Sequence, residues 1–161
     1  MPKVLVMYYT RTGNTQVMAQ EISESMKQVS GIEVDLKPVV EVEPSELKNY
    51  DVLIMGAPTY YGSMPWECKK LIDDSVKYHG ELAGKLGGAF TSSANIGGGN
   101  ETTLLNIHHA WLIHGMVVLG MHQGDHYGPV GIKTPDERSL NCCRNYARRM
   151  AELACRLYSS H

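Results

Sequence analysis

The sequence of 161 residues has no long hydrophobic run. Its first apolar stretch, Val4 to Met7, is too short for the core of a secretory signal peptide. No other stretch approaches the ~20 apolar residues that cross a bilayer. We therefore expect a protein without a membrane span. The net charge is only −2, so no excess of one sign points to nucleic acid or an anionic membrane surface as a partner.

The chain is also poor in patterns for disulfides and metals. A chain of this length needs no disulfide framework, and no C-x-x-C pair occurs among its four cysteines, which are Cys68, Cys142, Cys143 and Cys155. None of the seven histidines falls in an H-E-x-x-H arrangement. We therefore expect no metal site, and a reducing cytoplasm as the location.

Two common nucleotide-binding motifs are missing as well. The sequence contains no G-x-x-x-x-G-K-[ST] loop, and no G-x-G-x-x-G opens a helix. It also contains no repeat, low-complexity tract or obvious linker. With 43% hydrophobic and 20% charged residues, the chain has an ordinary globular composition. Its length favours one domain, which we place at residues 1–161.

Strand and helix patterns alternate along this domain. Strands are predicted from short runs of apolar or alternating residues at 4–8, 32–36, 51–57, 87–91 and 116–119. Helical spacing of apolar residues predicts helices over 14–29 and 101–113. Another helix is predicted to begin near Pro65 and to turn Val76 inward. A final helix is predicted to bury an apolar stripe that runs from Leu140 to Leu157. Such alternation is typical of βαβ units in a parallel sheet.

The second strand indicates the order of that sheet. It alternates apolar with charged residues, as a half-exposed edge strand does, whereas the run 51–57 reads as buried on both faces. We therefore predict a three-layer α/β fold with five parallel strands in the order 2-1-3-4-5 and helices on both faces. Ligands of such sheets bind beyond the carboxyl ends of the strands. The loops after strands one, three and four are consequently the candidate site.

The loop after strand one is rich in groups that bind anions. Hydroxyls, an amide and backbone N–H groups gather there at a helix N-terminus in the run Thr10, Arg11, Thr12, Gly13, Asn14 and Thr15. Gly13 allows the backbone to approach a ligand closely. A simple helix cap is the alternative, but one cap explains one position rather than a whole run. We therefore interpret the loop as a phosphate site.

The other two loops suit a planar ring. After strand three, two tyrosines between prolines form a stiff aromatic shelf in the run Pro58, Thr59, Tyr60, Tyr61 and Gly62. After strand four, glycines expose backbone N–H groups in the run Ser92, Ser93, Ala94, Asn95, Gly97 and Gly98. Each signal is weak alone, because tyrosine-bearing or flexible loops are common. Together the three loops predict one pocket.

These residues resemble a known family. Thr10-Arg-Thr-Gly-Asn-Thr15 is similar to the FMN phosphate loop of flavodoxins. Four further segments resemble the WrbA-type NAD(P)H:quinone oxidoreductases. They are Pro58-Thr-Tyr-Tyr-Gly62, Phe90-Thr-Ser-Ser93, Gly97-Gly-Gly-Asn-Glu-Thr-Thr103 and His114-Gly-Met116. The resemblance implies a flavodoxin-like fold with FMN. Thr10 to Thr15 would surround the phosphate, and Thr59 to Gly62 with Ser92 to Gly98 would hold the ring. It also implies that His114 reaches the substrate side of the flavin, and that the protein is a homo-dimer or homo-tetramer.

Two functions of different classes follow. In the first, NAD(P)H passes a hydride to the flavin, which gives two electrons to a quinone. His114 would then bind or protonate the quinone oxygen, unless it is only a helix-end histidine stabilised by the helix dipole. In the second, the chain is a flavodoxin-type electron carrier that docks on protein partners through a charged face. A non-catalytic FMN-binding interaction protein is neither favoured nor excluded.

Overall fold

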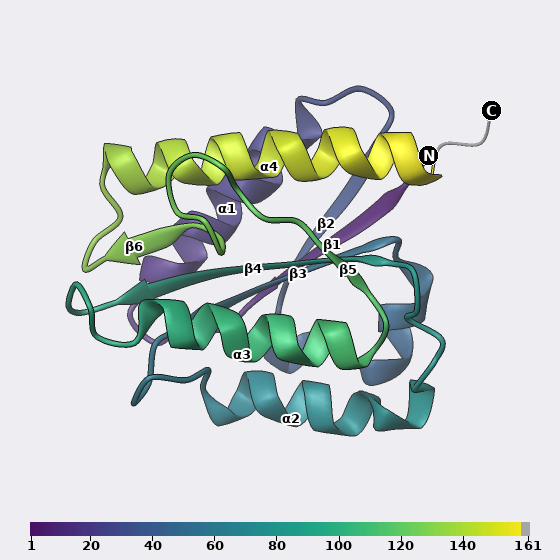
Figure 1. Cartoon of the computed structure of the whole chain (residues 1–161), viewed down its shortest axis with the longest axis horizontal. Coiled ribbons are helices and arrows are strands. Elements are labelled where there is room, and N and C mark those ends of the chain that lie inside the picture. The colour runs from purple at the N-terminus through teal and green to yellow at the C-terminus, as the bar shows by residue number, and fades with distance from the viewer. Residues whose placement is uncertain (159–161) are drawn as a thin grey trace.

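The computed structural model describes residues 1–158, so the last three residues of the predicted domain lie outside the described part. Parallel strands form one central sheet with helices on both faces (Figure 1). The strands are β1 (Lys3–Tyr8), β2 (Glu33–Pro38), β3 (Val52–Pro58), β4 (Leu86–Ser93), β5 (Val117–Val118) and β6 (Val130–Ile132). Their order, β2-β1-β3-β4-β5, confirms the predicted fold class.

Burial explains why this order could be predicted. Nearly every residue of β1, β3 and β4 is buried, because both faces of these central strands are covered. Over the first four residues of β2, by contrast, exposed and half-buried residues alternate. Its side chains therefore have to be polar at every second position, which is the edge-strand pattern seen in the sequence.

The helices form the two outer layers. They are α1 (Asn14–Lys27), α2 (Trp66–Asp74), α3 (Asn100–Ile113) and α4 (Glu137–Tyr158), with short 3-10 turns η1 (Val39–Glu41), η2 (Pro44–Asn49) and η3 (Ser75–Tyr78). Met18 of α1 and Met150 of α4 are buried with one face of the sheet, and Leu104 and Trp111 of α3 with the other. Figure 1 shows α1 and α4 on one side of the sheet and α2 and α3 on the other.

The fifth position of the sheet differs from the prediction. One continuous strand was expected over 116–119, but β5 has only two residues, and β6 fills the rest of the position after a loop. β5 pairs with the start of β4 (Leu86 with Val117), and β6 pairs with its end (Thr91 with Val130). Glycines 120, 124 and 128 and Pro129 interrupt the strand, because glycine disfavours and proline prevents regular ladder pairing.

Two helix ends and the burial of one helical residue also differ from the prediction. The first helix was predicted to reach residue 29, but it ends at Lys27. Val76 was predicted to face inward, but α2 ends at Asp74, and the tighter η3 turn leaves Val76 67% exposed. Leu157 was predicted to be buried and is 50% exposed. At about 1.5 Å per residue, α4 is longer than the strands it covers, so its last turn extends past the sheet.

Candidate functional site

The loop between β1 and α1 opens toward solvent at the carboxyl edge of the sheet. Gly13 is the N-cap of α1 and has φ 95°, in the left-handed region that favours glycine. Its N–H donates to Thr10 Oγ1 at 3.0 Å, which closes the loop on itself. The first turn of α1 contains no acidic residue, and its N–H groups have no helical partners. A helix start of this kind can bind an anion.

A buried hydrogen bond joins this loop to β4. Thr15 is 1% exposed, and its Oγ1 lies 2.8 Å from Ser92 Oγ. The two residues are 77 positions apart in the sequence. The start of α1 is thereby fixed against the end of the central strand β4, where the third predicted loop begins.

The loop after β3 forms a tight turn. Tyr60 N–H donates to Ser63 O at 2.8 Å, and Ser63 N–H donates to Tyr60 O at 3.1 Å. The two central residues both have positive φ, 50° at Tyr61 and 76° at Gly62, as in a type I′ turn. As a result Tyr61 is fully exposed, while Tyr60 turns back toward the cavity.

The loop after β4 packs against this turn. Thr102 Oγ1, in the first turn of α3, donates to Gly62 O at 2.7 Å. Gly99 has φ 100° and approaches Gly62 so closely that a Cβ at Gly99 would lie 2.5 Å from Gly62 Cα. Glycine at position 99 is therefore required both by its backbone conformation and by the space available.

The three loops enclose one cavity of about 560 Å³ at the carboxyl edge of the sheet. Its lining residues are Thr10, Arg11, Thr12, Asn14, Thr15, Pro58, Thr59, Tyr60, Ser92, Ser93, Ala94, Lys133 and Thr134. The structure thus brings together eleven of the predicted cofactor-binding residues. The others lie in the same loops but do not line the cavity; they are Gly13, Tyr61, Gly62, Asn95, Gly97 and Gly98.

Hydrogen bonds between threonine hydroxyls connect the elements that form the cavity. Thr59 N–H donates to Ser92 O at 2.8 Å, and Thr59 Oγ1 lies 3.0 Å from Thr91 Oγ1. Thr103 of α3 donates to Thr59 Oγ1 at 3.1 Å. These contacts hold the ends of β3 and β4 and the start of α3 in one rigid unit.

One wall of the cavity is aromatic. The rings of Tyr9 and Tyr60 meet edge to face, with centroids 6.4 Å apart. The pKa of the half-buried Tyr9 hydroxyl is raised, first by the neighbouring Glu67 carboxylate. Glu67 itself does not line the cavity, whose only charged lining residues are Arg11 and Lys133.

The comparison with known families decides the family of this chain. The family model for flavodoxins matches residues 6–104, which include all three loops. The chain belongs to the flavodoxin family. Among curated relatives, a protein named NAD(P)H dehydrogenase (quinone) from Chromohalobacter salexigens is 33% identical over 98% of this chain and 99% of its own length. A flavodoxin from Aquifex aeolicus is 39% identical over 94% of this chain and 86% of its own.

Solved structures agree with this assignment. A WrbA-like flavodoxin from Agrobacterium tumefaciens has a TM-score of 0.80 at 25% identity and covers 98% of this chain and 99% of its own. Flavodoxin 2 from Bacillus cereus has a TM-score of 0.81 at 26% identity, with 94% and 99% of the two chains covered. The family is therefore shown at the level of both sequence and fold.

FMN is the cofactor of flavodoxins, and the cavity of this flavodoxin fits it. The volume lies within the ~300–1,000 Å³ usual for small-molecule sites. The start of α1 offers free N–H groups for a phosphate without an acidic residue to repel it. Tyr60 supplies an aromatic wall for a planar ring. When bound, FMN supplies the redox chemistry.

Sequence reasoning missed two residues of the cavity, Lys133 and Thr134. They follow β6, which completes the fifth position of the sheet, so they stand at a carboxyl strand end like the other loops. Lys133 has φ 57°, and its N–H donates to Ser93 O at 2.7 Å, which fixes it beside the third loop. Because the fifth strand is interrupted, the sequence pattern did not show that Lys133 and Thr134 follow a strand.

Lys133→Met is expected to weaken FMN binding about two- to fivefold at low salt, as exposed charge pairs usually do. The effect should vanish near 1 M salt, because charges are screened beyond about 3 Å there. Quenching of flavin fluorescence measures the Kd. Lys77→Met, which removes an exposed charge from η3, is the control. An equal effect of the two substitutions would contradict a role for Lys133 at the cofactor.

The structure places His114 outside this cavity. His114 follows the last residue of α3, while the cavity lies at the other end of that helix, about 20 Å away at 1.5 Å per residue. It lines a separate groove between α2 and α3. The expectation that His114 reaches the flavin of its own chain is therefore wrong. A catalytic role could act only on the flavin of another copy, and His114→Ala would change quinone turnover only in that case.

Among residues 1–158, no helix is long and apolar enough to cross a membrane. The same residues contain no group of three or more His, Cys, Asp or Glu side chains that could hold a metal ion.

Proposed function

We propose that this flavodoxin-family protein is an FMN-dependent NAD(P)H:quinone oxidoreductase. NAD(P)H would deliver a hydride to the bound flavin. The reduced flavin would then pass two electrons to a quinone, which takes up two protons to become a quinol. Thr10 to Thr15 would hold the phosphate of FMN. Thr59 to Gly62 and Ser92 to Gly98 would hold its ring.

Exposed apolar side chains on the loops around the cavity carry this proposal. Tyr61 is fully exposed and Ile96 is 84% exposed, on the two loops assigned to the ring. Among residues 1–158, no carboxylate lines the cavity. Exposed apolar side chains on these loops suit a flat, uncharged acceptor such as a quinone, because burying Tyr61 and Ile96 against it removes apolar surface from water.

The relative named NAD(P)H dehydrogenase (quinone) supports the same function, because it aligns with 98% of this chain. We infer from it that nicotinamide nucleotides reduce the flavin, and from the resemblance to WrbA-type enzymes that the protein assembles as a homo-dimer or homo-tetramer. The four cysteines are free thiols, which suits a reducing cytoplasm as the location.

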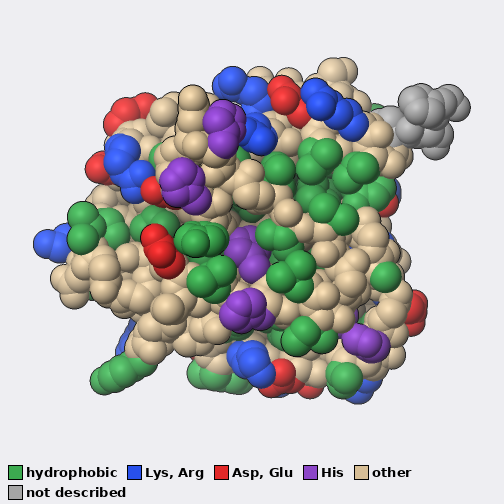
Figure 2. Space-filling view, in the orientation of Figure 1, with side chains coloured by type: hydrophobic (Ala, Val, Ile, Leu, Met, Phe, Trp, Pro, Cys, Tyr) green, Lys and Arg blue, Asp and Glu red, His purple; other side chains and the backbone are tan. Residues whose placement is uncertain are grey.

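An electron carrier is the second candidate, favoured by the relative named flavodoxin at 39% identity. Dedicated carriers use a strongly charged face to steer brief encounters with protein partners. The net charge of this chain is only −2. Figure 2 shows basic and acidic side chains scattered in small groups over one face of the molecule rather than gathered in a patch of one sign. The carrier is therefore the less supported function.

Anaerobic titration of the FMN-loaded protein with NADH and NADPH tests the proposal. We expect at least one nucleotide to bleach the visible flavin spectrum directly, followed by rapid reoxidation on addition of a quinone. An electron carrier would instead react with neither nucleotide, and chemical reduction would give a long-lived half-reduced spectrum. That second outcome would overturn the reductase.

A further inference from the structure

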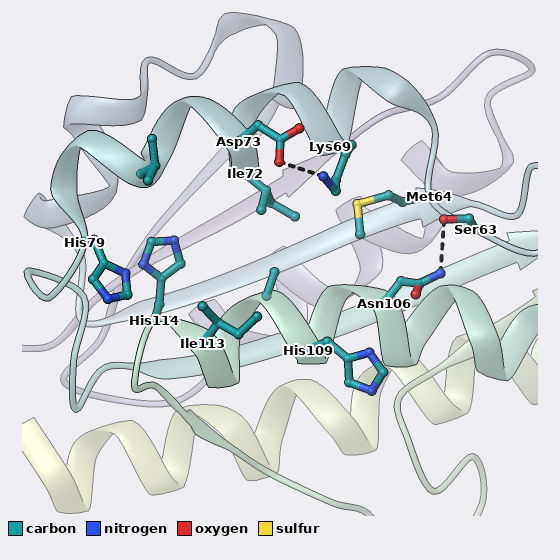
Figure 3. Close-up of a pocket in the computed structure, with 12 residues that line it drawn as sticks. Ser63, Met64, Lys69, Ile72, Asp73, His79, Asn106, His109, Ile113 and His114 are labelled. Atoms are coloured by element: carbon teal, nitrogen blue, oxygen red, sulfur yellow. Dashed lines mark hydrogen bonds and ion pairs between the residues drawn. The ribbon is translucent and has the colours of Figure 1, made fainter.

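A groove of about 610 Å³ runs between α2 and α3 and shares no lining residue with the FMN cavity (Figure 3). Apolar side chains such as Ile72 and Ile113 form its walls. Two imidazoles, His79 and His114, stand together at one end of the groove in Figure 3. The proposed reductase chemistry uses neither of them within one chain.

The hydrogen bonds of His114 define which of its nitrogens carries a proton. Ser75 Oγ donates its only proton to Ile72 O, at 2.6 Å. His114 Nε2 lies 2.8 Å from the same Ser75 Oγ, so Nε2 must be the donor in that contact. Nδ1 of His114 therefore carries a free lone pair. That atom is buried without any hydrogen-bond partner, in a residue only 6% exposed.

His79 faces this unpaired nitrogen. The two ring centroids are 5.9 Å apart and the ring planes are tilted by 39°. Figure 3 shows the edges of the two rings turned toward each other. Two imidazoles that hold one tetrahedral ion at about 2.0–2.1 Å place their ring centres roughly 5 Å apart. A small rotation of the exposed His79 would close this difference.

We propose that His79 and His114 bind a divalent transition-metal ion of the Zn²⁺ type, independently of FMN. Imidazole nitrogen is a preferred ligand of such ions. The contact from Nε2–H to Ser75 is the outer hydrogen bond that usually orients a metal-binding histidine. No third His, Cys, Asp or Glu completes a cluster among the described residues, so water would fill the remaining positions.

The surroundings are compatible with a cation. Burial, and to a lesser extent the neighbouring His79, lower the pKa of His114. Asp73 is the only carboxylate among the lining residues and is paired with Lys69 at 2.6 Å. These two charges offset each other, and the site depends on the two imidazoles alone.

Calorimetric titration of the FMN-loaded protein with Zn²⁺ tests this proposal. We expect one ion per chain, and at least tenfold weaker binding in His79→Asn and in His114→Asn. His109→Asn is the matched control, because His109 is exposed and lines the same groove. It should bind Zn²⁺ as the wild type does. Ser75→Ala should weaken binding as well, by releasing the orientation of His114.

His79→Asn keeps the test decisive if His114→Asn does not fold. Zn²⁺ should also raise the Tm of the wild type and of His109→Asn, but not that of His79→Asn. The proposal is overturned if the wild type binds no Zn²⁺, or binds it no more tightly than His79→Asn. The Kd for FMN, measured in parallel, should be unchanged in His79→Asn, so a failure of the metal site is distinguishable from a failure of the reductase.

Discussion

Gly99→Ala is expected to weaken FMN binding at least tenfold and to lower the Tm by roughly 5–10 °C. Gly99 has φ 100°, and an added Cβ would lie 2.5 Å from Gly62 Cα. A backbone atom cannot move aside as a flexible side chain can, so the loops after β3 and β4 must separate. Strain of this kind costs about 2–3 kcal/mol. Fluorescence titration with FMN and thermal unfolding measure the two effects.

Gly97→Ala is the matched control. Gly97 also has a positive φ, 64°, and lies in the same loop, but no atom is within 4 Å of an added Cβ. It therefore carries a backbone cost without the clash against Gly62. If Gly99→Ala and Gly97→Ala had the same Kd for FMN within twofold, the close approach of the two loops would not be what shapes the cavity.

Thr12→Asp is expected to weaken FMN binding about ten- to hundredfold. Thr12 lines the cavity in the loop assigned to the phosphate. A carboxylate roughly 5 Å from a phosphate repels each of its charges by about 1–3 kcal/mol, depending on the local dielectric. The Kd values for FMN of the wild type and the variant, compared at low salt, measure the loss.

Thr12→Asn and riboflavin make this test specific. Asparagine has the shape of aspartate without its charge, so Thr12→Asn should retain most of the affinity for FMN. Riboflavin lacks the phosphate, so its Kd should be nearly the same in Thr12→Asp and Thr12→Asn. An equal loss for both flavins in Thr12→Asp would place the phosphate elsewhere in the cavity.

The sequence alone was sufficient for the fold. Apolar runs at β1 and β3 and the alternation along β2 follow from whether one or both faces of a strand are covered, which is a local property of the pattern. The order of the strands then restricted the site to loops at their carboxyl ends. Thr10 to Thr15 could be assigned as an anion loop because N–H groups at a helix start are free whatever the rest of the chain does.

Only the tertiary structure decided which side chains meet. Lys133 lines the cavity because an eleven-residue interruption, 119–129, splits the fifth strand and returns the chain to the end of β4. His114 lies outside the cavity because the length of α3 places the two ends of that helix at opposite edges of the sheet. Neither outcome is encoded in a local pattern.

The same division holds for individual contacts. The sequence placed Thr15 at the start of a helix and Ser92 directly after a strand, but it did not show that their hydroxyls lie 2.8 Å apart. No sequence pattern related His79 to His114, and only the tertiary structure brings the two rings to 5.9 Å. The physical reason is that periodicity reports which face of an element is buried, whereas the distance between two elements depends on how every side chain between them packs.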